Sequence, residues 1–331
     1  MTRLLAVLTI ALSGALAFGI ARGAAPTDTR APYAVGLIDA VWTDNSRQRS
    51  LPLRLRLPEA PGRRPVVIFS HGLGGSVDGG RAWGEHWARQ GFVVIHLQHP
   101  GSDQGTWHGA ERPAESLRAA ANPEQYIARV ADVKFVLDEL ARRQSAGEPW
   151  AQALDLSRVG MSGHSFGALT TQALAGQRLE VPPAWHAKAA SLAEPRLRAF
   201  MAFSPSARSP AAARQFLTIE RPFFSITGSA DGMVGPGLGV PPALRQVPFE
   251  GMPGPDQYLL VLDQADHMVF NGAPAGRGTR DAGRDGRHIE LVAALSTAFW
   301  RAYLMDDAGA RAWLERHAAA EVGAAGVFQR K

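Results

Sequence analysis

The sequence predicts an α/β fold with a mostly parallel sheet flanked by helices. Short runs of β-branched and aromatic residues, such as Pro65–Ser70 and Phe92–Leu97, are typical of parallel strands buried on both faces. Amphipathic stretches with helical spacing alternate with these runs, which favours βαβ crossovers. The 46% apolar content of the 331 residues excludes a disordered chain.

The expected strands follow one another along most of the chain. Residues 51–57 alternate apolar and polar side chains with a period of two, as in a half-exposed early strand. The buried runs at 65–70 and 92–97 come next. Further strands are expected at residues 158–161, 197–203, 222–227 and 257–262.

Helices are expected between these strands and after the last one. Residues 80–90 have helical character, and Asn122-Pro123-Glu124 supplies a cap, a proline at the first helical position and an early acid. Residues 285–304 read as a long closing helix with Ile289, Val292 and other apolar residues on one face. Two long segments, 99–122 and 228–256, follow strands and should overhang the carboxyl edge of the sheet, where such folds place their sites.

Composition excludes several kinds of site. The chain has no cysteine, so it has no disulfide, thiolate zinc site or cysteine nucleophile. The pI near 10 reflects only three lysines and four tyrosines rather than a basic stripe, and we expect no nucleic-acid partner. His96, His99, Asp103 and His108 match no metal-ligand spacing, so we expect no metal and no cofactor.

The first residues have the pattern of a secretory signal peptide. Arg3 precedes an apolar run that ends in the small residues around Gly23–Ala25, which favours cleavage there. The alternative is a membrane anchor, for which the run is marginal. We expect a signal peptide at residues 1–24 and one domain over 25–331. This predicts a periplasmic or secreted protein with no stable membrane anchor after cleavage.

Residues Gly163–Gly167 read Gly-His-Ser-Phe-Gly, between an expected strand and a helix-like run. In this context the G-x-S-x-G pattern predicts a nucleophile elbow, which lifts the Ser165 hydroxyl clear of the sheet. The residues two positions away must be small because the turn is crowded. A chance glycine turn is the alternative, and the strand–turn–helix context disfavours it.

A second glycine-rich loop, Phe69–Gly75, directly follows a buried strand. A developing oxyanion needs about two preorganised hydrogen-bond donors. The backbone N–H of Phe166, after the nucleophile, should supply one, and that of Leu73 should supply the other. A plain turn before a helix would produce a similar glycine pattern in this loop.

A base and an acid should follow the nucleophile in the order Ser, acid, His. His267 lies just past the last expected strand, whereas His288 and His317 fall in helices and are expected at the surface. Asp231 follows the strand at 222–227, and it is favoured as the acid that orients the imidazole. The rival acids are Asp263 and Asp266, which lie close to His267 in sequence.

These motifs carry a family resemblance. Four segments resemble the α/β-hydrolase group of predicted dienelactone hydrolases, which includes enzymes similar to platelet-activating-factor acetylhydrolase. These segments are Phe69–Gly74, His99–Asp103, Arg129–Leu140 and Gly163–Gly167. The resemblance covers about residues 35–305. It implies an eight-stranded α/β-hydrolase fold and ester hydrolysis without a cofactor.

The resemblance also implies a triad of Ser165, Asp231 and His267, with Leu73 and Phe166 as oxyanion donors. There are departures. True dienelactone hydrolases use a cysteine nucleophile, which this chain lacks. Animal acetylhydrolases carry the acid after an earlier strand, and the matching residues here, Ala202–Ser206, contain no acid.

Together these observations predict a serine carboxylester hydrolase that acts on short-acyl or lipid-like esters through an acyl-enzyme. Three alternatives remain open. The protein could be a polyesterase or lipase for large substrates, an acyltransferase, or an inactive hydrolase fold used as a binding module. The sequence does not fix the oligomeric state.

Overall fold

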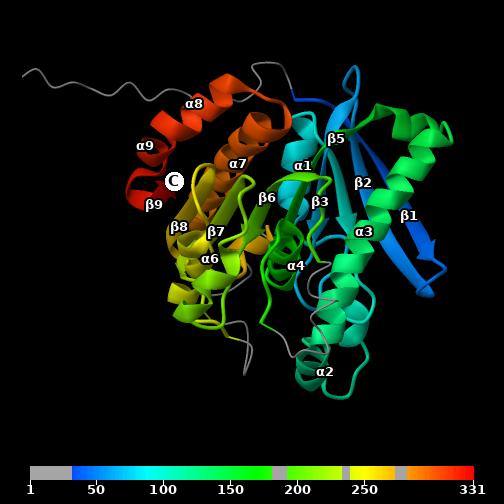
Figure 1. Ribbon diagram of the computed structural model, residues 1–331, viewed down its shortest axis with the longest axis horizontal. Coiled ribbons are helices and arrows are strands. Elements are labelled where there is room, and N and C mark those ends of the chain that lie inside the picture. The colour runs from blue at the N-terminus through cyan, green and yellow to red at the C-terminus, as the bar shows by residue number, and fades with distance from the viewer. Residues whose placement is uncertain (1–31, 181–191, 233–238, 273–281) are drawn as a thin grey trace, which may run out of the picture.

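A nine-stranded sheet forms the centre of the computed structural model, which describes residues 32–180, 192–232, 239–272 and 282–331 (Figure 1). The strand order is β1-β2-β4-β3-β5-β6-β7-β8-β9. The strands are β1 Val35–Asp44, β2 Arg49–Pro58, β3 Arg64–Ser70, β4 Val93–Leu97, β5 Leu154–His164, β6 Leu197–Phe203, β7 Phe223–Ala230, β8 Gln257–Asp266 and β9 Gly326–Arg330.

The sheet is parallel in its interior and antiparallel at its two edges. Strands β4, β3, β5, β6, β7 and β8 pair in parallel, while β1–β2, β2–β4 and β8–β9 are antiparallel. The predicted mostly parallel α/β fold is therefore confirmed. The described residues contain nine strands instead of the expected eight, because the chain returns after its last helices and pairs Gly326–Arg330 with β8.

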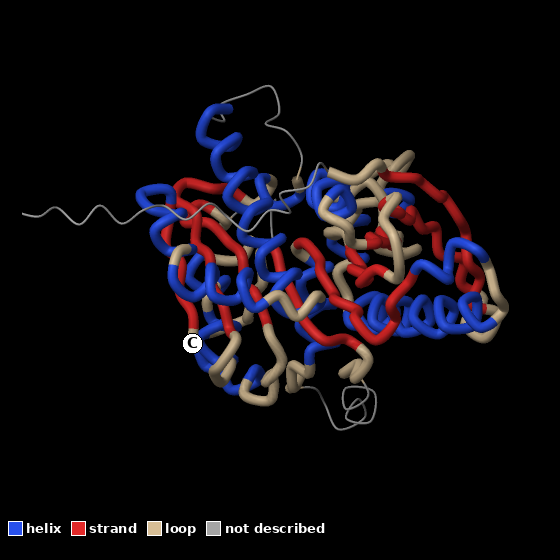
Figure 2. Tube along the Cα trace, turned by 90° about the horizontal axis from the view of Figure 1, so that it is seen from above, coloured by secondary structure: helices blue, strands red, loops and turns tan. Residues whose placement is uncertain are grey.

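Helices cover both faces of the sheet (Figures 1 and 2). One face packs against α3 and α4, and the other against α1, α7 and α8. The helices are α1 Arg81–Arg89, α2 Pro113–Ala120, α3 Pro123–Ser145, α4 Phe166–Ala175, α6 Val247–Gly251, α7 Ala282–Leu304, α8 Ala308–Arg316 and α9 Ala318–Val322.

The helix starts follow the predicted chemistry. The Asn122 side chain accepts a hydrogen bond from the N–H of Gln125 at 2.8 Å and caps α3. Along α7 the buried face includes His288, Leu291 and Val292, so the predicted face is rotated towards His288. The expectation that His288 lies at the surface is wrong: it is 1% exposed, and burial lowers its pKa.

The two long segments contain short helices as well as loops. Residues 99–122 include α2 and a 3₁₀ turn, and residues 228–256 include the end of β7, the 3₁₀ helix Pro242–Arg245 and α6. Within the described ranges, no helix is long and apolar enough to cross a membrane. The predicted signal peptide lies outside the described residues, so it stays a prediction.

Candidate active site

Ser165 lies in a sharp turn between β5 and α4. Its backbone has φ 56° and ψ −111°, a conformation that costs free energy for a residue with a side chain. A Cβ on Gly163 would overlap the carbonyl of Gly167, and one on Gly167 would overlap the carbonyl oxygen of Ser70. Both glycines are thus required by close packing of the turn, and the Ser165 side chain remains half-buried.

The loop after β3 lies directly against this turn. A Cβ placed on Gly72 would be 3.5 Å from Cβ of Ser165 and 3.2 Å from Nδ1 of His164. Leu73 follows Gly72, and Phe166 is the first residue of α4, where backbone N–H groups have no partner within the helix. The structure therefore places the two sequence-predicted donor residues on the two segments that meet at Ser165.

The first long segment holds this loop in place. The Gly74 N–H donates to the Ser102 carbonyl at 2.9 Å, and the Trp107 indole donates to the Gly74 carbonyl at 2.8 Å. A Cβ on Gly74 would be only 2.6 Å from Leu117 of α2. Residues 99–122 therefore cover the outer side of the loop that contains Leu73.

Asp231 and His267 meet at the carboxyl ends of β7 and β8. The His267 Nδ1–H donates to Oδ1 of Asp231 at 2.7 Å, and the Thr227 hydroxyl donates to Oδ2 at 2.8 Å. The Asp231 side chain is 0% exposed and that of His267 is 3% exposed. Within the described residues, Nε2 of His267 has no hydrogen-bond partner, so its lone pair is free to accept a proton.

His164 connects the elbow to the His267 turn. Its Nε2–H donates to the backbone carbonyl of His267 at 3.0 Å, and the two rings are 4.5 Å apart. Burial, followed by the neighbouring His267 and Arg245, holds the pKa of His164 well below its usual range. His164, the residue before Ser165, is thus neutral, and its hydrogen bond supports the backbone of His267.

The two rival acids, Asp263 and Asp266, accept hydrogen bonds from other groups. Asp263 is exposed and accepts a hydrogen bond from the Ser229 hydroxyl at 3.0 Å. Asp266 accepts the N–H groups of Met268 and Val269 at 2.9 and 3.1 Å, and so fixes the turn that carries His267.

A second Ser, His and Asp array is fully buried behind the Leu73 loop. Nε2 of His99 is 2.9 Å from the Ser70 hydroxyl, and its Nδ1 is 2.9 Å from Oδ2 of Asp132. Arg47 and Arg49 also contact this carboxylate at 2.7 and 2.8 Å. Burial and the charge of the Arg129 guanidinium lower the pKa of His99 to about 4, whereas Asp132 raises it only in part. With no exposed surface, Ser70 cannot meet a substrate, so this array is structural.

Arg129 links this array to the Leu73 loop and to the turn at Ser165. It donates to the His71 carbonyl at 2.7 Å and to the Ser102 hydroxyl at 2.8 Å. Its guanidinium also lies 4.4 Å from the centre of the Phe166 ring. The His71 ring contacts the Gly72 carbonyl through Nδ1 and accepts the His99 N–H through Nε2. His71 thus braces the Leu73 loop through both ring nitrogens.

Arg245 is a functional candidate that the sequence did not indicate. Its Nε is 3.3 Å from Oδ1 of Asp231, and its side chain is 3% exposed. The sequence signal for Arg129 was its place in the Arg129–Leu140 resemblance, but Arg245 follows a Gly- and Pro-rich stretch with no recognisable pattern.

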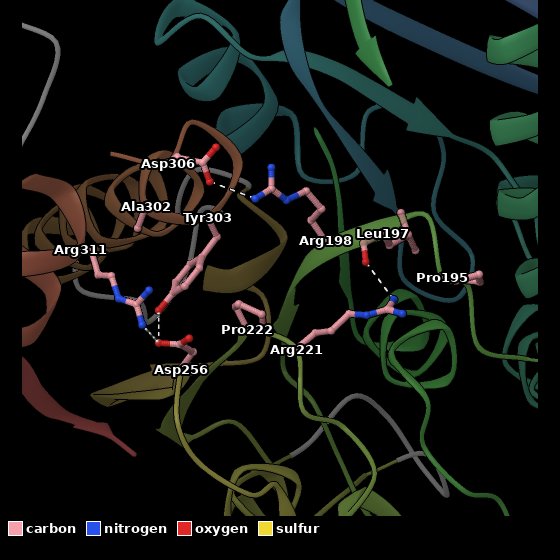
Figure 3. A pocket seen from close by; sticks show the side chains of 10 residues that line it. All are labelled: Pro195, Leu197, Arg198, Arg221, Pro222, Asp256, Ala302, Tyr303, Asp306 and Arg311. Atoms are coloured by element: carbon pink, nitrogen blue, oxygen red, sulfur yellow. Dashed lines mark hydrogen bonds and ion pairs between the residues drawn. The ribbon is translucent and has the colours of Figure 1, made fainter. Parts of the chain in front are cut away.

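A pocket of about 380 Å³ lies at the opposite edge of the sheet, where β6 and β7 begin (Figure 3). Its charged side chains are largely paired: Arg198 with Asp306 at 2.9 Å and Arg311 with Asp256 at 2.6 Å. The pocket is therefore separate from Ser165, Asp231 and His267, which lie at the carboxyl ends of their strands. The described residues contain no group of three or more acidic or histidine side chains that could hold a metal ion.

The strand order and the sharp turn between β5 and α4 are those of the α/β-hydrolase fold. Residues 42–126 match the sequence model of a family described as platelet-activating factor acetylhydrolase, isoform II. The match confirms the resemblance noted in the sequence, and it indicates a hydrolase that acts on esters. It contains the Leu73 loop and ends before Ser165. No curated protein matches the chain.

Proposed function

We propose that the protein is a serine carboxylester hydrolase in which Ser165, His267 and Asp231 form the catalytic triad. The observation that carries this proposal is the 2.7 Å hydrogen bond between His267 and the buried Asp231, at the sheet edge that carries the Ser165 elbow. In a neutral imidazole this bond places the hydrogen on Nδ1, so Nε2 carries the lone pair that a general base needs.

In this mechanism the Ser165 hydroxyl attacks the ester carbonyl carbon, and its proton moves to Nε2 of His267. Asp231 stabilises the imidazolium that forms. The N–H groups of Leu73 and Phe166 bind the developing oxyanion. The intermediate then expels the alcohol, which takes the proton from His267. Water, deprotonated by the same nitrogen, hydrolyses the acyl-enzyme, and Ser165 recovers its proton.

Short-acyl or lipid-like esters are the proposed substrates. Trp107 and Leu117 pack onto Gly74, next to the proposed oxyanion donor Leu73. These large side chains support the proposal of a small acyl group. Met268, directly after His267, is 46% exposed and offers an apolar surface to the alcohol portion of a substrate. We also propose that the protein is exported, on the basis of its N-terminal sequence pattern, and that it uses no cofactor.

The test is hydrolysis of p-nitrophenyl esters of two to twelve carbons by the purified protein, with Ser165→Ala as the comparison. We expect hydrolysis that falls with chain length, covalent labelling of Ser165 by a fluorophosphonate, and loss of both in the variant. Ser157→Ala, on the exposed start of β5, is the control that should keep both. Full activity of Ser165→Ala would refute the proposal. Faster hydrolysis of polyester films or lipid emulsions would favour the polyesterase or lipase alternative, and absence of labelling would favour a binding module.

A further inference from the structure

We propose that Arg245 is a positioning residue that holds Asp231 in place and keeps His267 unprotonated, and therefore active, at lower pH. The inference rests on the proposed triad and adds to it a fourth charged group. Arg245 touches the acid and the base of the triad from the 3₁₀ helix that follows residues 233–238.

The contacts of Arg245 fix both the carboxylate and the backbone of Asp231. Nε is 3.3 Å from Oδ1 and 3.1 Å from the carbonyl oxygen of the same residue. One terminal nitrogen donates to the Ser204 carbonyl at 3.0 Å, which ties the end of β6 to the Asp231 turn. A guanidinium suits this place because its donors form a planar fork that can reach three acceptors at once.

The other terminal nitrogen of Arg245 lies 3.5 Å from Nδ1 of His267. Nδ1 donates its N–H to Asp231 and therefore has no lone pair that could accept a hydrogen bond from Arg245. The two side chains are close, but they are not hydrogen-bonded to each other. When Nε2 takes up a proton, two positive charges stand side by side in a buried place. The guanidinium therefore opposes protonation of His267, while Asp231 favours it.

Among the residues that the structure describes, the other charged or titratable neighbours of His267 do not replace this effect. His164, on β5, packs against the ring and stays neutral, and Arg245 is among the groups that lower its pKa. Asp266, at the end of β8, turns its carboxylate to the N–H groups of Met268 and Val269. Among the described residues around His267, Arg245 thus supplies the positive charge and Asp231 the negative charge.

A simpler role for Arg245 is to staple the loop, through its bonds to two backbone carbonyls. The two roles differ in their pH dependence. A loss of loop packing lowers the rate at every pH, whereas loss of the charge moves the acid limb of the rate profile. A neighbouring charge within about 4–6 Å shifts the titration of an ionisable group by roughly 1–3 pH units, and a like charge disfavours the charged form.

The experiment measures kcat/KM for p-nitrophenyl acetate from pH 4.5 to 9 in the wild type, Arg245→Met, Arg245→Lys and Arg221→Met. Arg221 is the matched control, since it donates to the carbonyls of Glu194 and Leu197 at 2.9 Å near the opposite edge of the sheet (Figure 3). We expect Arg245→Met to move the acid limb upward by roughly one pH unit. Arg245→Lys keeps the charge, so its limb should stay near the wild-type position at a reduced kcat. Arg221→Met should leave the profile unchanged.

An Arg245→Met profile that is lower at every pH but not displaced would overturn the inference and leave only the staple. Arg245→Gln, which is neutral but can still donate to a carbonyl, replaces the methionine variant if that one does not fold. The histidine ring signals of the folded proteins, followed by NMR across the same pH range, report protonation of His267 without catalysis. Absence of wild-type hydrolysis would therefore refute the proposed function, while an unchanged His267 titration in the variant would refute this inference by itself.

Discussion

Replacement of Asp231 by asparagine tests the buried charges of the site most directly. In the wild type, the Arg245 guanidinium lies 3.3 Å from the Asp231 carboxylate, and the two side chains are 3% and 0% exposed, respectively. In Asp231→Asn the guanidinium loses this carboxylate but keeps its two backbone carbonyl acceptors. Breaking a buried ion pair by removal of one partner costs about 3–5 kcal/mol of stability. Because two hydrogen bonds remain, we expect about 3 kcal/mol, read as the free energy of unfolding in urea.

The same substitution removes the negative charge that stabilises protonated His267. We expect kcat for p-nitrophenyl acetate to fall roughly thousandfold or more. The double variant Asp231→Asn/Arg245→Met removes the orphaned cation as well. It should recover roughly 2 kcal/mol of stability, within the range of coupling energies between residues in contact, and recover none of the activity.

Asp263→Asn is the control, because Asp263 is exposed and bonds only a serine hydroxyl among the contacts described. It should change stability by less than about 0.5 kcal/mol and leave kcat near the wild-type value. Additive stability changes in the Asp231 and Arg245 variants would show that the two side chains do not interact energetically. A thousandfold loss in Asp263→Asn would instead make that residue the acid.

Two further predictions rest on the structure and one on the sequence. Gly167→Ala should destabilise the fold by about 3 kcal/mol or more in urea unfolding, because its Cβ would overlap the Ser70 carbonyl oxygen. The control Gly286→Ala, at an open and exposed position of α7, should raise the free energy of unfolding by up to about 1 kcal/mol. Equal changes in the two variants would contradict this prediction. His99 has its pKa lowered to about 4 in the folded state, so the unfolded chain binds its proton first, and the contribution of His99 alone should lower stability by roughly 3 kcal/mol as the pH falls from about 6.5 to 4. His99→Gln should make the measured decrease smaller by about this amount, and an unchanged slope would refute the prediction. If the first residues are a signal peptide, N-terminal sequencing of the exported protein should find a start near Gly23–Ala25, and an intact N-terminus would refute cleavage.

The features that the sequence revealed are those whose constraint is local. The elbow requires Gly163 and Gly167 because neighbouring backbone leaves no space for a Cβ, and such a requirement appears directly as a spacing of glycines. The positions of Asp231 and His267 follow from chain order and from the ends of two recognisable strands. Local periodicity also revealed α3 and its Asn122 cap.

What the sequence did not reveal depends on contacts between distant segments. Arginine is usually exposed, but Arg129 and Arg245 are buried here by contacts with residues distant in sequence. Arg129 donates to Ser102, and Arg245 contacts Ser204 and Asp231. The ninth strand has five residues, among them Gln329 and Arg330, and it becomes a strand through pairing with β8. The burial of His288 was within reach, since it is four residues from Val292 and seven from Leu295, on one helical face.

The site contains two buried charge networks, one behind each half of the proposed machinery. Arg245 and Asp231 hold the base, while Arg129, His99 and Asp132 hold the loop that carries Leu73. Burial of charges is costly, and apolar side chains of similar size would often give equal or greater stability. A network of hydrogen-bonded charges instead specifies orientation, which apolar packing does less well.

Orientation matters here because the proposed base and the proposed oxyanion donors come from segments far apart in sequence, and the proposed mechanism requires both to act at the Ser165 hydroxyl. Gly72 lies against Ser165 and His164, and His164 holds the backbone of His267, so the two halves join at the elbow. Substitutions in either network should therefore reduce kcat more than they raise KM, because they displace groups that act on the transition state and leave most of the surface that binds the ester unchanged.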